Sequence, residues 1–307
     1  MKENRKQSPA MRRRNLFIFL MLLWPVLHFV LMQFLNFNMV IMAFNNYTMG
    51  ANNPVFVGFE NFERVFRLFN QDRVNNEWHA VRNSLSLVGV TLFINTPMAL
   101  AFAYLLYTKV RGHGWMKVIL YLPCVTSAVV LVLIFKSFMT SGPVDTLYSI
   151  LGIFDKLPNE GWLGENTAWN TILLFSVWTG FSQNMLFFFS AMNRIPHDFI
   201  EAAKLDGASE PRIFFSLVLP LISTTVSTML TISLAQLFGW CMPSMLFMRD
   251  DSGINFTGTL GLSILHWTTV KEYGVAAAYG ILLTLIGAPI TLAIRALGNK
   301  LQTEVEY

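Results

Sequence analysis

The chain has 307 residues, of which 54% are hydrophobic and only 13% are charged. Because an ordinary soluble domain carries about a quarter charged residues, this composition excludes one. The formal net charge is +4, but no stripe of basic and aromatic residues lies on a soluble segment, which argues against nucleic-acid binding.

Six apolar stretches follow one another along the chain, and each is long enough to cross a bilayer, which takes about 20 mostly apolar residues in a helix. We predict spanning helices near 16–44, 83–107, 115–139, 169–192, 216–241 and 274–297. The predicted fold class is therefore all-α, a polytopic membrane protein with six transmembrane helices. A further charge-free run, 252–270, is rich in Gly, Ser and Thr. Only Lys271 and Glu272 separate it from the last span, so we expect an external loop or a re-entrant segment there.

The two ends of the chain are predicted to be short tails, 1–15 and 299–307, around a membrane domain at 16–298. The basic N-terminus precedes an apolar run that is too long for a signal peptide and lacks a clean cleavage site, so we expect a retained first helix. Cys124 and Cys241 form no spacing motif and carry no information on the redox compartment.

Basic residues are distributed unevenly over the two faces that six spans create. The tails and the connections after the second and fourth spans, together with Lys117 and Arg295 at the adjoining ends of spans, hold 14 of the 22 Lys and Arg residues, whereas the opposite face holds seven. Since basic residues favour the cytoplasmic side, we expect both termini and the connection after the fourth span to be cytoplasmic.

That connection reads PHDFIEAAKLDGASEPRIFFSLVLP over 196–220 and predicts a polar helix–turn–helix. Pro196 suits the first turn of a helix, and Gly207 supplies a backbone conformation that residues with a Cβ avoid. A second short helix can begin around Ser209 and Pro211. On local chemistry alone, a docking surface and an ordinary connecting loop both remain open.

The same segment carries an ordered set of residues. These are Glu201, Ala202 and Ala203, then Gly207, then Leu217, Leu219 and Pro220. The set resembles the EAA loop of the membrane subunits of bacterial ABC importers, in which Ile usually stands where this chain has Leu217. The resemblance implies the type I permease fold. It also implies that 193–215 carries a coupling helix, which sits in a groove of the ATP-hydrolysing subunit.

Further segments resemble one branch of these importers, the carbohydrate-uptake permeases of the maltose type. They occur in the family order and are 57–62 (VGFENF), 111–114 (RGHG), 121–123 (YLP), 162–164 (WLG) and 273–278 (YGVAAA). Their placement, together with a C-terminal end that lacks a Gly-rich tail, resembles the first of the two permease types. One loop departs from the family pattern, because 247–253 reads FMRDDSG where L-T-x-G-G-P is usual.

The resemblance also implies partners and a location. We expect a second permease subunit of similar fold, two ATP-binding subunits and an extracellular solute-binding protein, all working at the bacterial cell membrane. ATP and Mg are expected on the ATP-binding subunits, and no cofactor on this chain. The expected substrate is a carbohydrate, specifically an oligosaccharide, and glycerol phosphate or a polyol is the alternative within the same family.

Functions of other classes find less support in the residues. The chain has no G-x-x-x-x-G-K-[ST] loop and no H-E-x-x-H zinc motif, so we expect neither an ATP site nor a metal site. The run 180–183 has the G-x-S-x form of an intramembrane serine protease, but the last span contains no His to act as the base. A secondary transporter often carries charged residues mid-membrane. Here the spans contain only Lys136 and Arg295, near helix ends where they can snorkel.

A sugar path needs hydrogen-bonding groups for hydroxyls and aromatic faces for the apolar side of the ring. Matching to the family's maltose-type pocket falls on positions in the third, fourth and fifth spans, and Ala128 of the third span is one of them. The candidate set is Cys124, Ser176, Thr179, Gly180, Gln183, Ser233, Gln236, Leu237 and Trp240. We favour Gln183, Gln236 and Trp240, since a long amide without a partner is costly to bury. Helix–helix packing is the alternative for each Ser and Thr.

Overall fold

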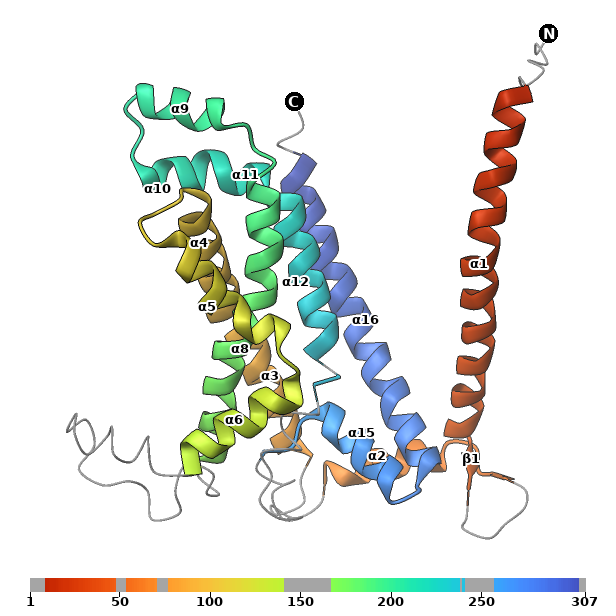
Figure 1. The fold of residues 1–307 in the computed structure, drawn as a ribbon. Coiled ribbons are helices and arrows are strands. Elements are labelled where there is room, and N and C mark those ends of the chain that lie inside the picture. Colours follow the sequence, from red (N-terminus) through yellow and green to blue (C-terminus); the bar gives the residue numbers. More distant parts are fainter. Residues whose placement is uncertain are drawn as a thin grey trace, which may run out of the picture.

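The computed structural model describes residues 9–47, 54–70, 77–140, 167–237, 239–240 and 257–303, and these residues are almost entirely helical (Figure 1). The longer helices are α1 (Pro9–Ala43), α3 (Trp78–Val90), α4 (Thr96–Tyr107), α5 (His113–Val125), α6 (Ala128–Thr140), α8 (Ala168–Met192), α12 (Ser223–Leu237) and α16 (Tyr273–Thr303). The shorter elements are β1 (Asn45–Asn46), β2 (Val55–Phe56), α2 (Glu60–Leu68), η1 (Thr91–Asn95), α9 (His197–Leu205), α10 (Glu210–Ile213), η2 (Phe214–Val218), α11 (Leu219–Leu221) and α15 (Leu260–Thr269). Both η elements are π-helical turns. Cys241, the segments 162–164 and 247–253, and the side chain of Leu237 lie outside the described residues.

Four helical segments are long and apolar enough to cross a membrane. They are Arg14–Ala43, Trp78–Tyr107, Ala168–Met192 and Tyr273–Ala296. Helices suit this environment because they satisfy their own backbone hydrogen bonds where no water is available. Two further helix pairs meet the same test together but are strongly bent, so the described residues contain four candidate spans, or up to six. The membrane architecture is confirmed, whereas six straight spans are not.

The predicted third span, 115–139, is not one helix. It consists of α5 and α6, whose axes differ by 107°. Pro123 lies in the last turn of α5, where it removes one backbone donor. Thr126 then adopts an extended conformation, and its side-chain hydroxyl donates to the carbonyl oxygen of Leu122 at 2.9 Å. The YLP segment therefore marks a break in the helix, which apolar content alone does not reveal.

The predicted fifth span, 216–241, is also divided. Residues 216–221 continue from α10 through η2 and α11, and α12 begins only at Ser223, after a bend of 72°. The bend occurs at Ile222, where the backbone leaves helical geometry with φ −99° and ψ 7°. The first part of this predicted span therefore belongs to the hairpin that precedes it.

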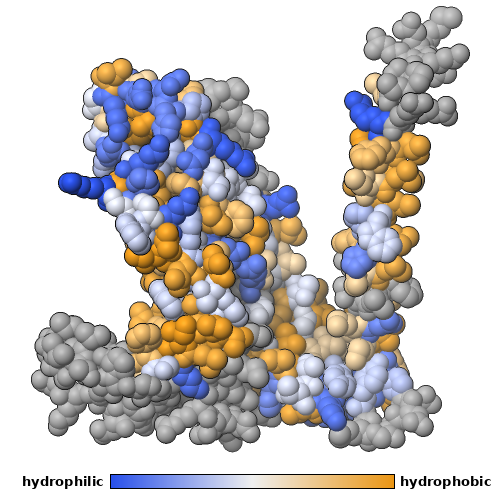
Figure 2. Space-filling model, in the orientation of Figure 1, coloured by the Kyte–Doolittle hydropathy of each residue, from blue (hydrophilic) through white to orange (hydrophobic). Residues whose placement is uncertain are grey.

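Helix α1 stands apart from the other helices along most of its length (Figure 1). Its surface is largely hydrophobic (Figure 2), and none of its membrane-crossing window is buried within the chain. Only its C-terminal end enters the body of the molecule, where Ala43 is fully buried. A helix that is apolar on all sides needs an apolar environment, which lipid or another membrane helix supplies.

The described ends of the chain lie at the same end of the molecule (Figure 1). The start of α1, the end of α16 and the polar hairpin formed by α9 and α10 are at one end of the molecule, and α2 and α15 are at the other (Figure 1). Because the described chain begins and ends at the same end of the molecule, it must pass between the two ends of the molecule an even number of times.

Two of the sequence segments singled out above, 57–62 and 273–278, meet at the end opposite the hairpin. Asn61 is buried and donates from Nδ2 to the carbonyl oxygens of Ala43 at 2.9 Å and Asn45 at 3.0 Å. A Cβ on Gly274 would overlap the Asn45 carbonyl oxygen and lie 2.6 Å from Asn61 Nδ2. The Asn of one segment and the Gly of the other therefore belong to one contact, which joins α1, α2 and α16.

The segment that was expected to be external or re-entrant, 252–270, contains α15. This helix has 10 residues, which is too short to cross a bilayer. The Thr259 hydroxyl caps it by accepting from the Leu262 backbone N–H at 3.3 Å. The Leu260 N–H donates to Ser84 Oγ at 3.0 Å, so α15 is fixed against α3.

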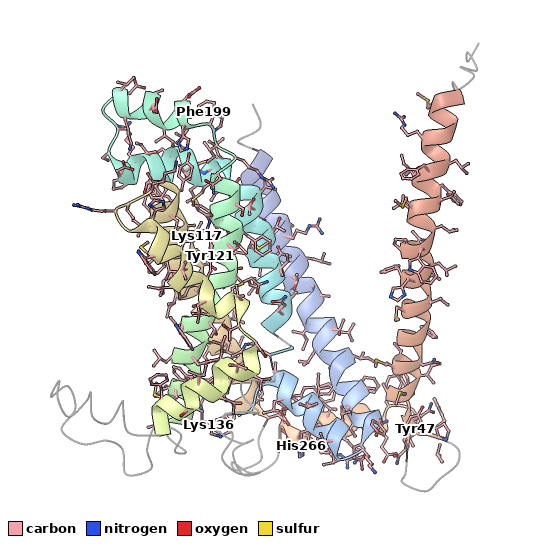
Figure 3. All side chains as sticks on the ribbon, in the orientation of Figure 1. Tyr47, Lys117, Tyr121, Lys136, Phe199 and His266 are labelled. Carbon is pink, nitrogen blue, oxygen red and sulfur yellow. The ribbon has the colours of Figure 1, made fainter. Side chains whose placement is uncertain are left out.

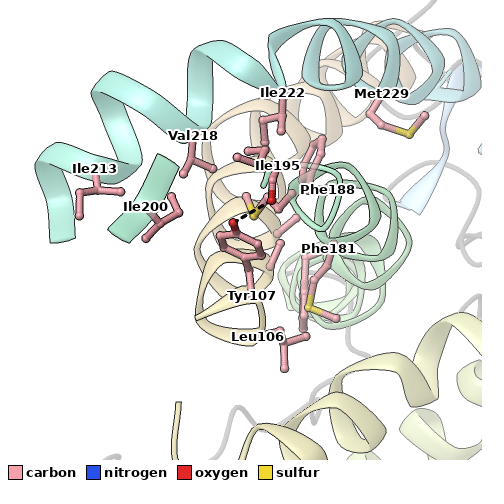
Figure 4. Packing of buried hydrophobic residues seen from close by; sticks show 14 residues of the cluster. Leu106, Tyr107, Phe181, Phe188, Ile195, Ile200, Ile213, Val218, Ile222 and Met229 are labelled. Atoms are coloured by element: carbon pink, nitrogen blue, oxygen red, sulfur yellow. Dashed lines mark hydrogen bonds between the residues drawn. The ribbon is translucent and has the colours of Figure 1, made fainter. Parts of the chain in front are cut away.

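The largest apolar cluster lies where α4 and α8 meet the hairpin (Figure 4). Phe188 and Met185 of α8 are completely buried, and Ile200 and Ile213 bring the two hairpin helices into the same cluster. The hairpin is therefore rooted in the core of the membrane domain and does not project from it as a free loop.

Candidate functional site

The turn between α9 and α10 has the geometry that the sequence suggested. Gly207 adopts a φ of +77°, in the left-handed region that favours glycine. Its N–H donates to the carbonyl oxygen of Lys204 at 3.0 Å, and the Ala208 N–H donates to that of Ala203 at 3.0 Å. These two bonds form a Schellman motif, which ends α9 and satisfies carbonyl groups that a helix terminus leaves free.

Polar and aromatic contacts fix the hairpin to the end of α4. Tyr104 donates its hydroxyl hydrogen to Glu210 Oε2 at 2.6 Å, and Lys204 Nζ lies 2.8 Å from Glu210 Oε1. The ring of Tyr107 stacks on that of His197 with centroids 5.5 Å apart. The Tyr107 hydroxyl also donates to the Ile195 carbonyl oxygen at 3.4 Å (Figure 4). Glu210 and both tyrosines were not among the predicted coupling residues, because nothing in the local sequence indicates contacts between positions about 100 residues apart.

The predicted coupling residues occupy two different surroundings. Glu201 and Ala202 are exposed on α9, and Ala203 is half-buried. Two large apolar side chains of the same helix are also exposed. Leu205 has 89% of its surface exposed, and Phe199, which is labelled in Figure 3, has 54%. By contrast, Leu217, Leu219 and Pro220 are half-buried, beside the apolar cluster. The EAA part of the set is thus mostly exposed on α9, and the L-x-L-P part is half-buried next to the apolar cluster.

Both π-helical turns directly precede an X-Pro pair. Pro97 follows η1, and Pro220 follows η2. In an α-helix, a proline ring clashes with the carbonyl four residues earlier. The wider turn instead bonds the Leu219 N–H to the Phe214 carbonyl oxygen, and the Thr96 N–H to that of Thr91. The proline of the EAA set therefore sits at a widened turn just before the 72° bend.

A cavity of about 250 Å³ lies between α3, η1, α8 and α12. Its lining residues are Leu87, Thr91, Asn95, Ser176, Thr179, Gly180, Gln183, Asn184, Phe187, Met229, Ile232, Ser233, Gln236 and Trp240. Hydroxyl and amide side chains make up about half of this set, and it contains no charged residue. The arrangement offers hydrogen-bond donors and acceptors to a neutral polar molecule inside a membrane domain.

The cavity brings together most of the residues predicted for a substrate path. Seven of the nine candidates line it, all from α8, α12 or the residues just after α12. Cys124 does not line it, because α5 carries this thiol on an exposed surface. The seven residues thus lie together in space, but whether they bind a substrate stays a prediction.

Three polar residues of the cavity were not in the predicted set. Asn184 of α8 donates from Nδ2 to Ser233 Oγ at 3.3 Å and so links α8 to α12. Thr91 and Asn95 come from η1, within the second span. The signal that could have identified Asn95 is an amide in the middle of an apolar span, where an unpartnered amide is costly.

The arrangement offers no support for an enzyme. Ser182, the serine of the G-x-S-x run, is completely buried, and its Oγ has no hydrogen-bond partner among the described residues. A serine nucleophile needs an adjacent base. In the described part of the chain, no group of three or more His, Cys, Asp or Glu side chains could hold a metal ion. Lys136 lies toward the end of α6 that is farther from the hairpin (Figure 3).

Comparison with known families identifies the kind of protein. Residues 96–303 match the model of a family described as "Binding-protein-dependent transport system inner membrane component". The chain belongs to this family. The matched region contains the hairpin and the α8 and α12 walls of the cavity. The resemblance drawn from the EAA loop is thereby confirmed. In this family the chain is the membrane permease of an ABC importer, and separate subunits hydrolyse ATP.

Individual relatives agree with the family assignment. The chain is 25% identical over 291 residues to the arabinooligosaccharides transport system permease protein AraP of Bacillus subtilis (strain 168). This alignment covers 92% of the chain and 85% of AraP. It is 30% identical over 227 residues to the lactose transport system permease protein LacF of Rhizobium radiobacter, covering 70% of this chain and 73% of LacF.

The fold also has a solved counterpart. A chain of a bacterial ABC transporter involved in the import of the acidic polysaccharide alginate superposes with a TM-score of 0.76 at 20% sequence identity. The alignment covers 94% of this chain and 96% of that one. The fold is therefore the type I permease fold of ABC importers.

Proposed function

We propose that the chain is one permease subunit of an ATP-driven importer of carbohydrate, specifically an oligosaccharide, and forms half of the path through the membrane. A second permease of similar fold, two ATP-binding subunits and an extracellular solute-binding protein complete the transporter. ATP and Mg bind to the ATP-binding subunits, and this chain holds no cofactor. Relatives of the chain include arabinooligosaccharide, lactose and glucose permeases, which supports carbohydrate as the substrate class.

The polar cavity between α8 and α12 is the observation that carries this proposal. Its hydroxyl and amide groups suit sugar hydroxyls, and Trp240 offers an aromatic face for a sugar ring. Because no Lys or Arg among the described residues lines it, a neutral sugar fits better than glycerol phosphate, whose recognition calls for positive charge. Ser176, Thr179, Gly180, Gln183, Ser233, Gln236 and Trp240 are the proposed path residues in this cavity, and Cys124 and Leu237 are the proposed path residues elsewhere.

The cavity volume suits one half of a shared path. It is slightly below the ~300–1,000 Å³ of typical ligand pockets. Gln183 and Gln236 line it and are nevertheless exposed, so it opens on their side. We place the second permease against this opening, where its residues complete the site. The exposed apolar surface of α1 supports contact with lipid or with that second subunit.

The hairpin is proposed as the docking element for the ATP-binding subunit. The hydrogen bond from Tyr104 of α4 to Glu210 and the exposed Leu205 and Phe199 support this role, since exposed apolar side chains grouped on one helix favour contact with a partner. With both bent pairs counted as spans, the chain crosses six times, and both termini and the hairpin are cytoplasmic.

Sugar uptake into proteoliposomes tests the proposed substrate class. The wild-type transporter would be given glucose, lactose and arabinotriose with its binding protein. Gln236→Ala and Trp240→Ala should each lower uptake while assembly and basal ATPase activity persist. Thr228→Ala is the matched control, because Thr228 is an exposed residue of the same helix outside the cavity. Uptake of none of these sugars by the wild type would refute the carbohydrate assignment. Normal uptake by both variants would move the path to other helices.

Labelling on intact cells tests the orientation. In a background with Cys124 and Cys241 replaced by Ser, a cysteine at Glu63 of α2 should react with an impermeant maleimide. A cysteine at Arg111, which precedes α5 near the hairpin end, should react only after permeabilisation. Both native side chains are exposed. The opposite labelling pattern would reverse the proposed orientation.

A further inference from the structure

Asn95 is a buried amide at the wall of the cavity, and only one of its polar atoms is occupied. Only 3% of its surface is exposed. Its Nδ2 donates to the Ser176 carbonyl oxygen at 3.2 Å. Its Oδ1 has no hydrogen-bond partner among the described residues. Because the Ser176 carbonyl can only accept, the amide must turn its nitrogen toward α8, which leaves the oxygen as a free acceptor.

The position of Asn95 depends on Gly180. A Cβ on Gly180 would overlap Asn95 Nδ2 and lie 3.1 Å from its Cγ. Gly180 therefore leaves the space in which the amide reaches the α8 backbone. On the other side, η1 places Asn95 at the end of a π-helical turn, and Thr96 reinforces this turn by donating from Oγ1 to the Thr91 carbonyl oxygen at 2.8 Å. π-Helical turns often occur at functional sites.

The free acceptor is costly unless it has a partner in the working protein. An unsatisfied buried acceptor costs about 1–3 kcal/mol, so a side chain of similar size without polar atoms would serve packing better. The same wall presents the Ser176 and Thr179 hydroxyls, but each already donates to a carbonyl of its own helix, at 2.8 Å and 2.9 Å. A hydroxyl that donates can still accept, so these two oxygens remain acceptors. Asn95 Oδ1 differs from them because it belongs to a buried amide and has no hydrogen bond of its own among the described residues.

We propose that Asn95 is a specificity-determining residue of the transport path, whose Oδ1 accepts a hydrogen bond from one sugar hydroxyl, and that Gly180 is the positioning residue that lets it do so. This inference rests on the proposed carbohydrate function. It adds α3 and η1 to the walls of the path, whereas the sequence pointed only to the third, fourth and fifth spans.

The test compares Asn95→Leu with wild type in purified transporters in proteoliposomes, with saturating sugar and binding protein so that the binding protein's affinity does not enter. The probe is whichever of glucose, lactose and arabinotriose the wild type imports fastest, together with its monodeoxy analogues. For one analogue, loss of the hydroxyl should slow wild-type uptake about tenfold, the effect of one hydrogen bond left unmade. Asn95→Leu should slow uptake of the parent sugar about tenfold but should no longer distinguish it from that analogue.

A control separates binding from folding. Asn83 is also a buried amide of the second span, and its Nδ2 donates to the Gly258 carbonyl oxygen at 2.9 Å, but it does not line the cavity. Asn83→Leu should lower the unfolding temperature of the empty transporter and leave discrimination among the analogues unchanged. Asn95→Leu also loses one bond, from Nδ2 to the Ser176 carbonyl oxygen, so it should lower that temperature to a similar extent. The discrimination among the analogues therefore decides between the two roles. Its loss in Asn83→Leu as well would show that weakened packing alone produces it, and would overturn the proposal.

Gly180→Ala provides an independent readout of positioning. It should reproduce the loss of discrimination, and Gly180→Ala combined with Asn95→Ala should be no worse than Asn95→Ala alone, because the clashing amide is gone. If the wild type imports sugar and every analogue is slowed equally in wild type and Asn95→Leu, Asn95 makes no sugar contact and the proposal fails alone. If the wild type imports none of the three sugars, the carbohydrate function fails and takes the Asn95 contact with it.

Discussion

Replacing Gly207 with Val should weaken the docking of the ATP-binding subunit. The φ of Gly207 is +77°, and a Cβ there would meet no atom within 4 Å. The cost of the substitution is therefore backbone strain without a steric clash, about 1–2 kcal/mol for a residue with a Cβ in this region. The chain can relieve the strain only by giving up the two Schellman hydrogen bonds that end α9. The native turn then becomes about 5–30-fold less favoured.

The assay is the affinity of the ATP-binding subunit for the permease pair, with hydrolysis stimulated by loaded binding protein measured in parallel. If docking requires the native turn, the dissociation constant should rise by up to about 30-fold for Val, less for Ala and least for Asn, which tolerates this conformation. Gly114→Val is the control, because Gly114 also has open space around it but lies in α5 without a positive φ. Unchanged affinity and unchanged stimulated hydrolysis in an assembled Gly207→Val transporter would refute the reasoning.

Three further substitutions follow from single contacts. Gly274→Ala should displace Asn61 and so lower the unfolding temperature of the transporter, with a loss of about 1–3 kcal/mol in the free energy of unfolding. An unchanged temperature would show that Asn61 can move aside without losing its hydrogen bonds. Tyr104→Phe removes the hydrogen bond to Glu210 and should speed amide hydrogen exchange in α9 and α10; equal exchange would mean that the apolar cluster alone holds the hairpin. Lys271→Gly should raise the unfolding temperature, since Lys271 has a φ of +66° on an exposed turn and relief of that strain gains about 1 kcal/mol, whereas a lower temperature would assign its side chain a stabilising role.

Features that depend on neighbouring residues were predictable from the sequence. Pro196, Gly207 and Ser209 each act on the backbone at their own position, and the structure has the helix, the left-handed turn and the second helix where they indicate. The presence of several long apolar helices was predictable for the same reason, because the capacity to cross a membrane is a property of each segment's own composition.

Features that depend on distant residues were not. Apolar content gives the length of a span but not its direction, so the bends of 107° and 72° were missed. The anchoring of Glu210 by Tyr104 joins positions 106 residues apart, and no local pattern encodes it. For the cavity, polar residues in the fourth and fifth spans were a sufficient signal. Asn95 is likewise a polar residue within an apolar span. It was missed because the matching to the maltose-type pocket included no position in the second span.

The structure also explains why a permease of this kind keeps polar residues in positions where they destabilise a membrane helix. Each of three buried asparagines forms a hydrogen bond between two elements that are separated in the sequence. Asn61 joins α2 to the end of α1, Asn83 joins α3 to the segment before α15, and Asn184 joins α8 to α12. Helices in lipid lack a strong hydrophobic drive to associate, so hydrogen bonds and close packing must specify their neighbours.

The hairpin and the cavity are linked by one helix. Tyr104 and Tyr107, which hold the hairpin, lie on α4, and Asn95 stands directly before the first residue of that helix. Nine residues of helix separate Asn95 from Tyr104, or about 14 Å at 1.5 Å per residue. The π-helical turn η1 runs directly into α4, so Asn95 and the two tyrosines are carried by one continuous helical segment. The acceptor in the cavity and the contacts that hold the hairpin therefore share the same support.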